Sequence, residues 1–343
     1  MALWAVVVLA AEGMATTLQW LGPPLRVAAP RAVVRDARTP TATGPHPEAL
    51  AVATPTHPVR QEPPPARDRL DIPVPAAALL EPMAGTGMML PRIASDGREA
   101  RLFYAARVPV LPRGAKRISI LLEGIGLSAA NSLDAIDQLP GAVSLAVSPY
   151  AVEPGAILDA ARKAGHELLL SLPMEPASAP FDDEGAKALT ARVDTAENMA
   201  RLLWSLSRVE GYAGVTNAFS GLDGQGFASS PQFADVAHAL ARRGLFYLDA
   251  TPDDPLPGGI AGVGADLRLD DPPAAADIDR QLAHLEQIAG SRGSAIGVAG
   301  PLYPVTIRRL ADWARALPSR GLVLVPVSSL VRPVPEPARR SLP

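Results

Sequence analysis

Short apolar runs alternate with amphipathic stretches along the chain from residue 116 onward. Apolar runs of roughly 4–8 residues are typical of buried strands, and apolar residues at every third or fourth position are typical of helices. The pattern predicts strands at 118–123, 143–149, 167–172, 212–217, 245–250, 265–269, 294–299 and 322–327. It predicts helices at 128–138, 154–164, 194–209, 231–243, 274–289 and 303–317.

Polar caps and glycines mark the ends of the predicted helices. Ser128 stands at a helix start, and Asp194 with Glu197 three residues later forms a capping box. Gly165 and Gly293 lie between a helix and the next strand, where glycine commonly ends a helix. Because strands and helices alternate, we expect a parallel sheet. The expected fold is a distorted (β/α) barrel of about seven parallel strands, and a doubly wound open sheet is the alternative.

Composition divides the rest of the chain into segments. Residues 1–21 predict a membrane anchor or signal-like segment, although Glu12 and the lack of a preceding Lys or Arg also fit a buried helix of a soluble domain. Residues 22–78 are rich in Pro and Ala and predict a disordered linker. An extended arm or hairpin then opens a domain over residues 79–333, and residues 334–343 predict a disordered tail. This layout predicts a periplasmic or other extracytoplasmic protein, either membrane-anchored or secreted.

The amino-acid composition narrows the possible chemistry. The net charge is −3 and 48% of the residues are hydrophobic, which allows a large core and gives no reason to expect nucleic acid as a partner. The sequence has no cysteine, which excludes disulfides, thiolate zinc sites and cysteine nucleophiles. No GxGxxG or Walker loop follows a predicted strand, and this disfavours nucleotide binding.

Residues at the predicted strand ends are the candidates for chemistry, because active sites of (β/α) barrels lie at the carboxyl ends of the strands. Glu123 ends the apolar part of the run RISILLEGIG, and Asp249 ends a later strand. We take these two as candidate catalytic residues. The candidate substrate-binding residues, which lie at or just after other strand ends, are Ser171, Met174, Glu175, Asn217, Phe219 and Tyr303.

Several of these segments together resemble one family. The segments ISILLEGIGLS, GHELLLSLPMEP, AGVTNAFSG, GLFYLDAT and AIGVAGPLYPVTIRRL follow the order and spacing of the divergent polysaccharide deacetylases. The resemblance covers residues 88–331 and includes the lead-in LPRIASDGR. It implies a distorted (β/α) barrel that acts on carbohydrate. The resemblance also implies the chemistry of the wider superfamily, in which a divalent metal such as zinc, held by an aspartate and histidines, activates water to remove acetyl groups, and a second aspartate acts as base.

The sequence departs from the family pattern at the implied metal ligands. The acidic pair of the family is replaced by Glu123 and Gly124. Ser171, Ala218 and Gly300 stand where the family has histidines, and none of them supplies a nitrogen ligand. We therefore expect neither a metal site nor another cofactor. The alternative is a weak all-oxygen site for Mg²⁺ or Ca²⁺, built from Glu123, Asn217 and Asp249.

Each candidate residue also has a structural explanation. Glu123 can be an acid–base group or a carboxylate kept for hydrogen bonding, and Glu175, between two prolines, suits a structural role in its turn. Asp249 can orient a substrate hydroxyl or cap a helix, and Asn217 can bind a sugar hydroxyl or join two loops. The apolar candidates can form a platform for a sugar ring or pack in the core. Two carboxylates across a cleft can also hydrolyse a glycoside.

These observations predict a polysaccharide deacetylase-like protein of carbohydrate metabolism in the cell envelope. We expect it to lack metal-dependent deacetylase activity and to act as a glycan- or partner-binding module. The expected partners are a carbohydrate such as a peptidoglycan-like glycan, an envelope protein, and the membrane through the N-terminal segment. The alternative is an active hydrolase or deacetylase with a site rebuilt around Glu123.

Overall fold

The computed structural model describes residues 72–108, 110–252 and 255–333. The predicted N-terminal segment, the predicted tail and most of the predicted linker lie outside the described residues. No helix within the described ranges is long and apolar enough to cross a membrane.

A parallel sheet and its connecting helices form the body of the described chain. The strands are β3 (Lys116–Ile125), β4 (Ser144–Val147), β5 (Leu168–Ser171), β6 (Gly214–Thr216), β7 (Phe246–Asp249), β8 (Gly262–Gly264), β9 (Leu267–Arg268), β10 (Ser294–Ala299) and β11 (Leu322–Leu324). The main helices are α3 (Ala129–Gln138), α4 (Gly155–Ala164), α5 (Thr195–Leu206), α7 (Phe233–Ala241), α8 (Ala275–Arg292) and α9 (Pro304–Ala316). Short elements complete the description: η1 (Ala77–Leu79), β1 (Leu80–Pro82), β2 (Met89–Pro91), α2 (Ala100–Phe103), α6 (Gln225–Ala228), η2 (Leu317–Arg320) and η3 (Val327–Leu330).

The predicted helix caps are present in the structure. The side chain of Ser128 accepts a hydrogen bond from the amide of Asn131 at the start of α3. Asp194 accepts one of 2.8 Å from the amide of Glu197 at the start of α5. α4 ends at Gly165, whose φ of 86° is the left-handed conformation that glycine adopts without strain. Local sequence therefore sets these helix boundaries.

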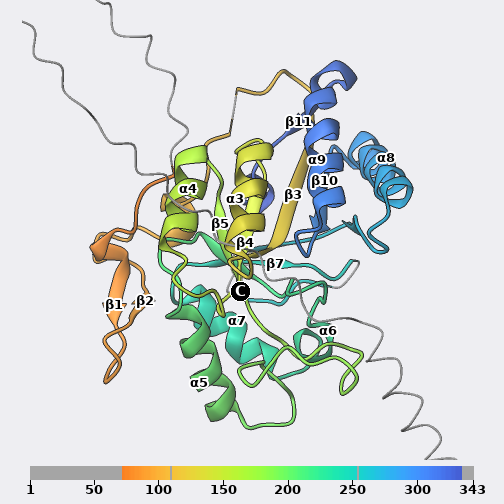
Figure 1. Cartoon of the computed structure of the whole chain (residues 1–343). Helices are drawn as coiled ribbons and strands as arrows, with labels where there is room; N and C mark the ends of the chain where they lie inside the picture. Colours follow the sequence, from red (N-terminus) through yellow and green to blue (C-terminus); the bar gives the residue numbers. More distant parts are fainter. Residues whose placement is uncertain (1–71, 109, 253–254, 334–343) are drawn as a thin grey trace, which may run out of the picture. The chain divides into compact units, whose positions relative to one another are not determined.

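The sheet is curled rather than flat (Figure 1). Its strand order is β8-β7-β6-β5-β4-β3-β10-β9, every pairing is parallel, and β11 pairs with the first part of β3. β8 and β9 form opposite ends of this order, although they follow each other in the chain. The sheet must therefore curl until its two ends come near each other. The expected distorted (β/α) barrel is confirmed as a curled, barrel-like parallel sheet.

The predicted strand at 265–269 is confirmed only at β9 (Leu267–Arg268), because residues 265 and 266 join β8 to β9. The amide of Ala265 donates to the carbonyl of Asp249 in β7 at 2.7 Å. The amide of Asp266 donates to the carbonyl of Ile296 in β10 at 2.8 Å. The segment between β8 and β9 thus bonds to both sides of the curled sheet, and β8 and β9 themselves are short.

The arm that precedes the sheet packs as a hairpin. β1 and β2 pair antiparallel and extend to one side of the domain (Figure 1). The chain just before them also contacts the domain: the amide of the buried Ile72 donates to the carbonyl of Arg162 at 3.0 Å. The amide of Ala76 donates to the hydroxyl of Tyr104 at 2.9 Å. Residues 72–78 therefore pack against the domain, although their composition predicts a linker.

The helices cover the outer face of the sheet. α3 packs against α4, and α8 packs against α9 and β10 (Figure 1). Strand residues such as Leu121, Leu145, Leu170 and Val298 are fully buried, as expected for parallel strands covered by helices. Buried polar side chains lie at both ends of the strands, and those at the carboxyl ends, such as Glu123, Asn217 and Asp249, form the candidate site.

Candidate functional site

Glu123 lies on β3 and is fully buried at the carboxyl end of the sheet. Its Oε1 accepts a hydrogen bond of 2.9 Å from the guanidinium of Arg268 and one of 3.1 Å from the amide of Gly221. Its Oε2 is buried and has no hydrogen-bond partner among the described residues. Burial raises the pKa of Glu123 to about 7, and the charge of Arg268 opposes this shift.

Arg268 joins the ends of several strands around this carboxylate. It comes from β9, and its guanidinium also donates to the carbonyl of Gly300 after β10 at 3.2 Å. A further hydrogen bond of 3.4 Å reaches the carbonyl of Leu222, after β6. The ion pair of Glu123 and Arg268 therefore fastens β3, β9 and two loops to each other. Removal of one partner of a buried pair of this kind strongly destabilises the folded protein.

Glu184 is a second buried acid at this end, and it comes from the long loop after β5. Its Oε2 accepts a hydrogen bond of 2.5 Å from the amide of Met174, and its Oε1 has no partner within the described ranges. Burial, together with the smaller effect of the nearby charge of Glu123, raises the pKa of Glu184 to about 9. The hydroxyl of Ser171 at the end of β5 is likewise buried and unpartnered in the described structure. Three buried polar atoms at this end of the sheet thus have no protein partner in the described structure.

Asn217 and Asp249 contact each other at the ends of β6 and β7. The side-chain amide of Asn217 donates to Oδ1 of Asp249 at 3.0 Å and to the hydroxyl of Thr251 at 3.4 Å. Its carbonyl oxygen accepts from the amide of Ala250 at 2.7 Å. Asp249 also accepts from the amide of Thr251 at 2.9 Å. This network joins two loops, which is one of the two roles expected for Asn217.

Asp270 holds the loop after β10. Its carboxylate accepts hydrogen bonds of 3.1 and 3.0 Å from the amide of Gly300 and one of 2.9 Å from the hydroxyl of Thr306. Burial raises the pKa of Asp270. Thr306 lies in the first turn of α9, so Asp270 fixes the start of this helix. Its role is to position the loop that carries Gly300.

Glu175 has both carboxylate oxygens engaged. One accepts from the hydroxyl of Thr190, and the other forms an ion pair of 2.8 Å with Arg192. These three residues and Glu184 line a pocket of about 350 Å³ in the loop after β5. The contacts are those of a structural carboxylate, and the pocket lies beside the strand ends.

The apolar candidates separate into buried and exposed side chains. Met174 is fully buried and packs in the core, and Phe219 is nearly so. The ring of Phe219 lies 5.8 Å from the ring of Tyr150, which lies 5.2 Å from that of Trp204. Tyr303 is partly exposed at the start of α9. Tyr150 and Trp204 extend the aromatic group and were not among the sequence candidates.

These residues do not fit a divalent metal of the deacetylase type. The guanidinium of Arg268 already neutralises the carboxylate of Glu123 through Oε1. Gly300 leaves no room for a histidine, because its φ is 133° and a Cβ there would lie 2.4 Å from Cγ of Glu123. Ser171 and Ala218 are buried and offer no nitrogen. In the part of the chain that the structure describes, no group of three or more His, Cys, Asp or Glu is placed to hold a metal.

The described histidines lie away from the strand ends. His166 is buried just before β5, with its ring nitrogens 2.8 and 3.4 Å from the carbonyls of Val143 and Ile136. His238 lies on α7 and His284 on α8, and both are exposed. None of the three is therefore placed to supply a ligand beside Glu123.

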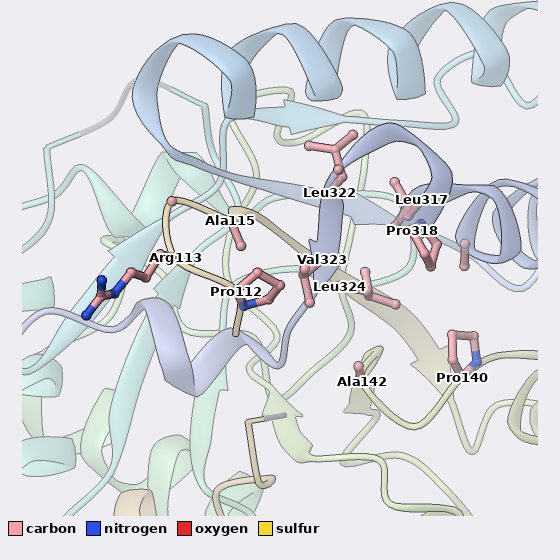
Figure 2. A pocket seen from close by; sticks show the side chains of 13 residues that line it. Pro112, Arg113, Ala115, Pro140, Ala142, Leu317, Pro318, Leu322, Val323 and Leu324 are labelled. Carbon is pink, nitrogen blue, oxygen red and sulfur yellow. The ribbon is translucent and has the colours of Figure 1, made fainter. Parts of the chain in front are cut away.

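A more apolar pocket lies at the opposite end of the sheet. It has a volume of about 610 Å³ and is bounded by β11, η2 and the segment before β3 (Figure 2). Leu322 and Leu324 of β11 and Pro318 of η2 line it. This pocket contains none of the candidate residues, so the candidate site remains at the carboxyl ends of the strands.

Sequence reasoning missed the two charged residues that most shape the site. Arg268 lies inside a predicted strand, and the sequence around it does not indicate which residue it pairs with. Glu184 lies in a loop without periodic pattern, between Asp183 and Gly185. Its burial depends on the path of the whole loop after β5. One signal was available in the sequence. The predicted strand at 265–269 ends next to Asp270, so Arg268 lies near the carboxyl end of a strand.

Comparison with known proteins agrees with this architecture. The divergent polysaccharide deacetylase family matches residues 120–331. An uncharacterized protein of Haemophilus influenzae is 28% identical over 231 residues, which cover 63% of this chain and 77% of that protein. The uncharacterized protein YibQ of Escherichia coli is 27% identical over 232 residues, which cover 65% of this chain and 69% of YibQ.

A solved structure extends the comparison to three dimensions. The crystal structure of an uncharacterized protein from Agrobacterium tumefaciens superimposes with a TM-score of 0.65 and 31% sequence identity. The match covers 71% of this chain and 100% of that one. Since the family match spans most of the sheet and its helices, the chain belongs to the divergent polysaccharide deacetylase family.

Proposed function

We propose that this protein is a polysaccharide deacetylase-like protein of the cell envelope that lacks metal-dependent deacetylase activity and acts as a glycan- or partner-binding module. The observation that carries this proposal is the buried ion pair of Glu123 and Arg268. The guanidinium of Arg268 lies against the carboxylate of Glu123, in the place that a metal ion would take beside a metal-binding carboxylate. The glycine at position 300 leaves space for the side chain of Glu123 and none for a histidine.

The unpartnered polar atoms support binding of a glycan. Oε2 of Glu123, Oε1 of Glu184 and Oγ of Ser171 can each bond a hydroxyl or an amide. Because the pKa of Glu184 is about 9, its carboxyl group is protonated at neutral pH and can donate a hydrogen bond. Glu123 accepts hydrogen bonds in its ionised form. A donor and acceptors together suit the hydroxyl and amide groups of a sugar.

The envelope location rests on the sequence alone. Residues 1–21 are apolar, and a Pro-rich stretch separates them from the domain. A tether of this composition holds a domain away from a membrane. Fusion of a reporter that matures only outside the cytoplasm to the C-terminus tests this part. A cytoplasmic location would contradict it.

The central experiment uses the full chain. Its metal content is measured by mass spectrometry after purification with zinc present, and acetate release is measured from acetylated glycans. Binding to peptidoglycan fragments is measured by calorimetry in parallel. We expect no stoichiometric zinc, no acetate release, and glycan binding that weakens in Glu184→Gln. Stoichiometric zinc together with acetate turnover would overturn the proposal.

A hydrolase rebuilt around Glu123 is the second candidate. The observation in its favour is that two buried acids with raised pKa values, Glu123 and Glu184, each have one free oxygen. Pairs of carboxyl groups in different protonation states serve as acid and base in glycoside hydrolysis. In that case Glu123→Gln abolishes turnover of a glycan while the fold persists. Unchanged turnover in this variant would end the hydrolase hypothesis.

A further inference from the structure

A pocket lined by three arginines lies at the amino ends of the strands. It has a volume of about 690 Å³ and is bounded by β8, the first residues of β10 and the chain that follows η3. The charged residues that line it are Arg117, Asp266, Arg292 and Arg332. Pockets of this size accommodate small molecules. None of the candidate residues at the carboxyl ends of the strands lines it, so it is a separate site.

Backbone pairing brings the three arginines to this pocket from distant parts of the chain. Arg117, the second residue of β3, lies opposite Ser294, the first residue of β10. The amide of Arg332 donates to the carbonyl of Gly262 in β8 at 3.0 Å, and the amide of Gly262 donates back to the carbonyl of Arg332 at 3.2 Å. Arg292 is the last residue of α8. The walls of the pocket are therefore joined by the sheet itself.

Asp266 neutralises one of the three arginines. Its Oδ1 accepts a hydrogen bond of 2.9 Å from the guanidinium of Arg292, and its Oδ2 accepts one of 2.8 Å from the amide of Ile296. Both oxygens of this carboxylate are thus engaged within the wall. Among the described residues that line the pocket, Asp266 is the one acid. The lining therefore has a surplus of two positive charges.

Arg117 and Arg332 supply this surplus. Within the described residues, neither guanidinium forms an ion pair or a hydrogen bond, and the hydroxyl of Ser294 forms no hydrogen bond there either. Arg117 is partly buried, so its charge loses part of its hydration without gaining a protein partner. A bound anion with several acceptor oxygens would compensate for this loss.

The charge and the size of the pocket select the class of anion. A phosphate monoester carries about −1.5 to −2 charges at neutral pH, which matches two unpaired arginines. A carboxylate carries one charge and would leave one arginine unpaired. Guanidinium groups also bond pairs of phosphate oxygens through their planar fork. The volume exceeds what a phosphate group alone needs, and Leu256 and Val263 add an apolar wall for an organic group.

We propose that this pocket binds an organic phosphate monoester, whose phosphate group lies between Arg117 and Arg332. The hydroxyl of Ser294 donates a further hydrogen bond to the phosphate. The organic part of the ligand packs against Leu256 and Val263. The inference goes beyond the proposed function, because it concerns the opposite end of the sheet and a different ligand.

The test measures binding to the full chain by calorimetry. The soluble probes are glycerol 3-phosphate, inorganic phosphate and glucuronate, and the lipid probe is phosphatidic acid in phosphatidylcholine vesicles. We expect saturable binding of a phosphate monoester that weakens at least tenfold in Arg117→Gln and in Arg332→Gln. Arg117→Lys keeps the charge and loses the planar fork, so its affinity should lie between those of wild type and Arg117→Gln. Arg308→Gln removes an exposed arginine of α9 outside the pocket and should leave binding unchanged.

The probes separate the sources of the phosphate and the outcomes that contradict the inference. Binding of glycerol 3-phosphate identifies a free ester, and binding of the phosphatidic acid vesicles alone identifies a lipid headgroup. Either result supports the inference. It would be overturned if neither ester bound saturably, or if inorganic phosphate or glucuronate bound as tightly as the ester. Unchanged ester binding in both glutamine variants, with thermal unfolding like that of wild type, would also overturn it.

Discussion

Arg268 donates a hydrogen bond of 2.9 Å to Oε1 of Glu123, and 145 residues of sequence separate the two. The pair is buried at the strand ends, where the family resemblance implies a metal. A fixed guanidinium and a divalent cation both neutralise a carboxylate, but only the metal activates water. The ion pair therefore balances the charge of Glu123 at the strand ends without a metal.

Removal of Arg268 should destabilise the protein most at high pH. In Arg268→Met, an ionised Glu123 is left buried without a cation, so unfolding at pH 8 should become easier by about 3 kcal/mol. At pH 5 Glu123 is mostly protonated in the folded state, and the loss should be smaller. Urea unfolding at both pH values measures the difference. As a control, Arg309→Met removes one partner of an exposed ion pair and should change the stability little at either pH. Equal losses at both pH values in Arg268→Met would contradict the prediction.

Glu184 should make the protein less stable as the pH rises. Its folded pKa is about 9 and its ordinary value is 4.5, so the folded state holds a proton that the unfolded state releases between these values. The contribution of Glu184 is full below pH 4.5 and is lost as the pH rises toward 9. Glu184→Gln removes this titration. The free energy of unfolding of the variant, relative to that of wild type, should therefore rise by about 2 kcal/mol or more between pH 5 and pH 8. Thermal unfolding across this range checks it. Glu197→Gln, on the exposed side of α5, should follow the wild-type curve.

Gly300 and Glu123 should show a steric coupling. Gly300→Ala places a Cβ 2.4 Å from Cγ of Glu123, at a φ of 133°, and should destabilise by about 2 kcal/mol or more. In a Glu123→Ala background Cγ is absent, so the same change should cost about 1 kcal/mol less. A double-mutant cycle in urea measures this coupling. Gly258→Ala, where nothing lies within 4 Å of an added Cβ, serves as the control. Additive effects would show that the two residues do not compete for the same space.

Asn217 should be required for the loops after β6 and β7. Asn217→Ala removes the acceptor of the Ala250 amide and the donor to Asp249, and it leaves a buried amide unpaired. A loss of about 2–3 kcal/mol is expected. Hydrogen exchange of the Ala250 amide should accelerate in the variant, whereas the exposed Asn131→Ala should change neither quantity. Slow exchange at Ala250 in Asn217→Ala would show that another acceptor replaces the side chain.

Much of the fold was predictable because it depends on neighbours in sequence. The run ending at Glu123 is apolar and β-branched, so it forms a buried strand whatever lies beside it. Ser128 and Gly165 set helix ends through contacts within one turn. The error at 265–269 arose where this locality fails. The backbone amides of Ala265 and Asp266 donate to the carbonyls of Asp249 in β7 and Ile296 in β10. Partners so distant in sequence do not affect the local hydrophobic pattern.

The sequence by itself determined the order of strands and helices, the position of Glu123 at a strand end, and the replacement of the family histidines by Ser171, Ala218 and Gly300. These properties follow from short-range patterns and from residue identity. Only the tertiary structure decided that Arg268 neutralises Glu123 and that Glu184 is buried beside them. A charge pair or a desolvated acid depends on which strand ends the curled sheet brings together, and that relation is set by packing between residues far apart in the chain.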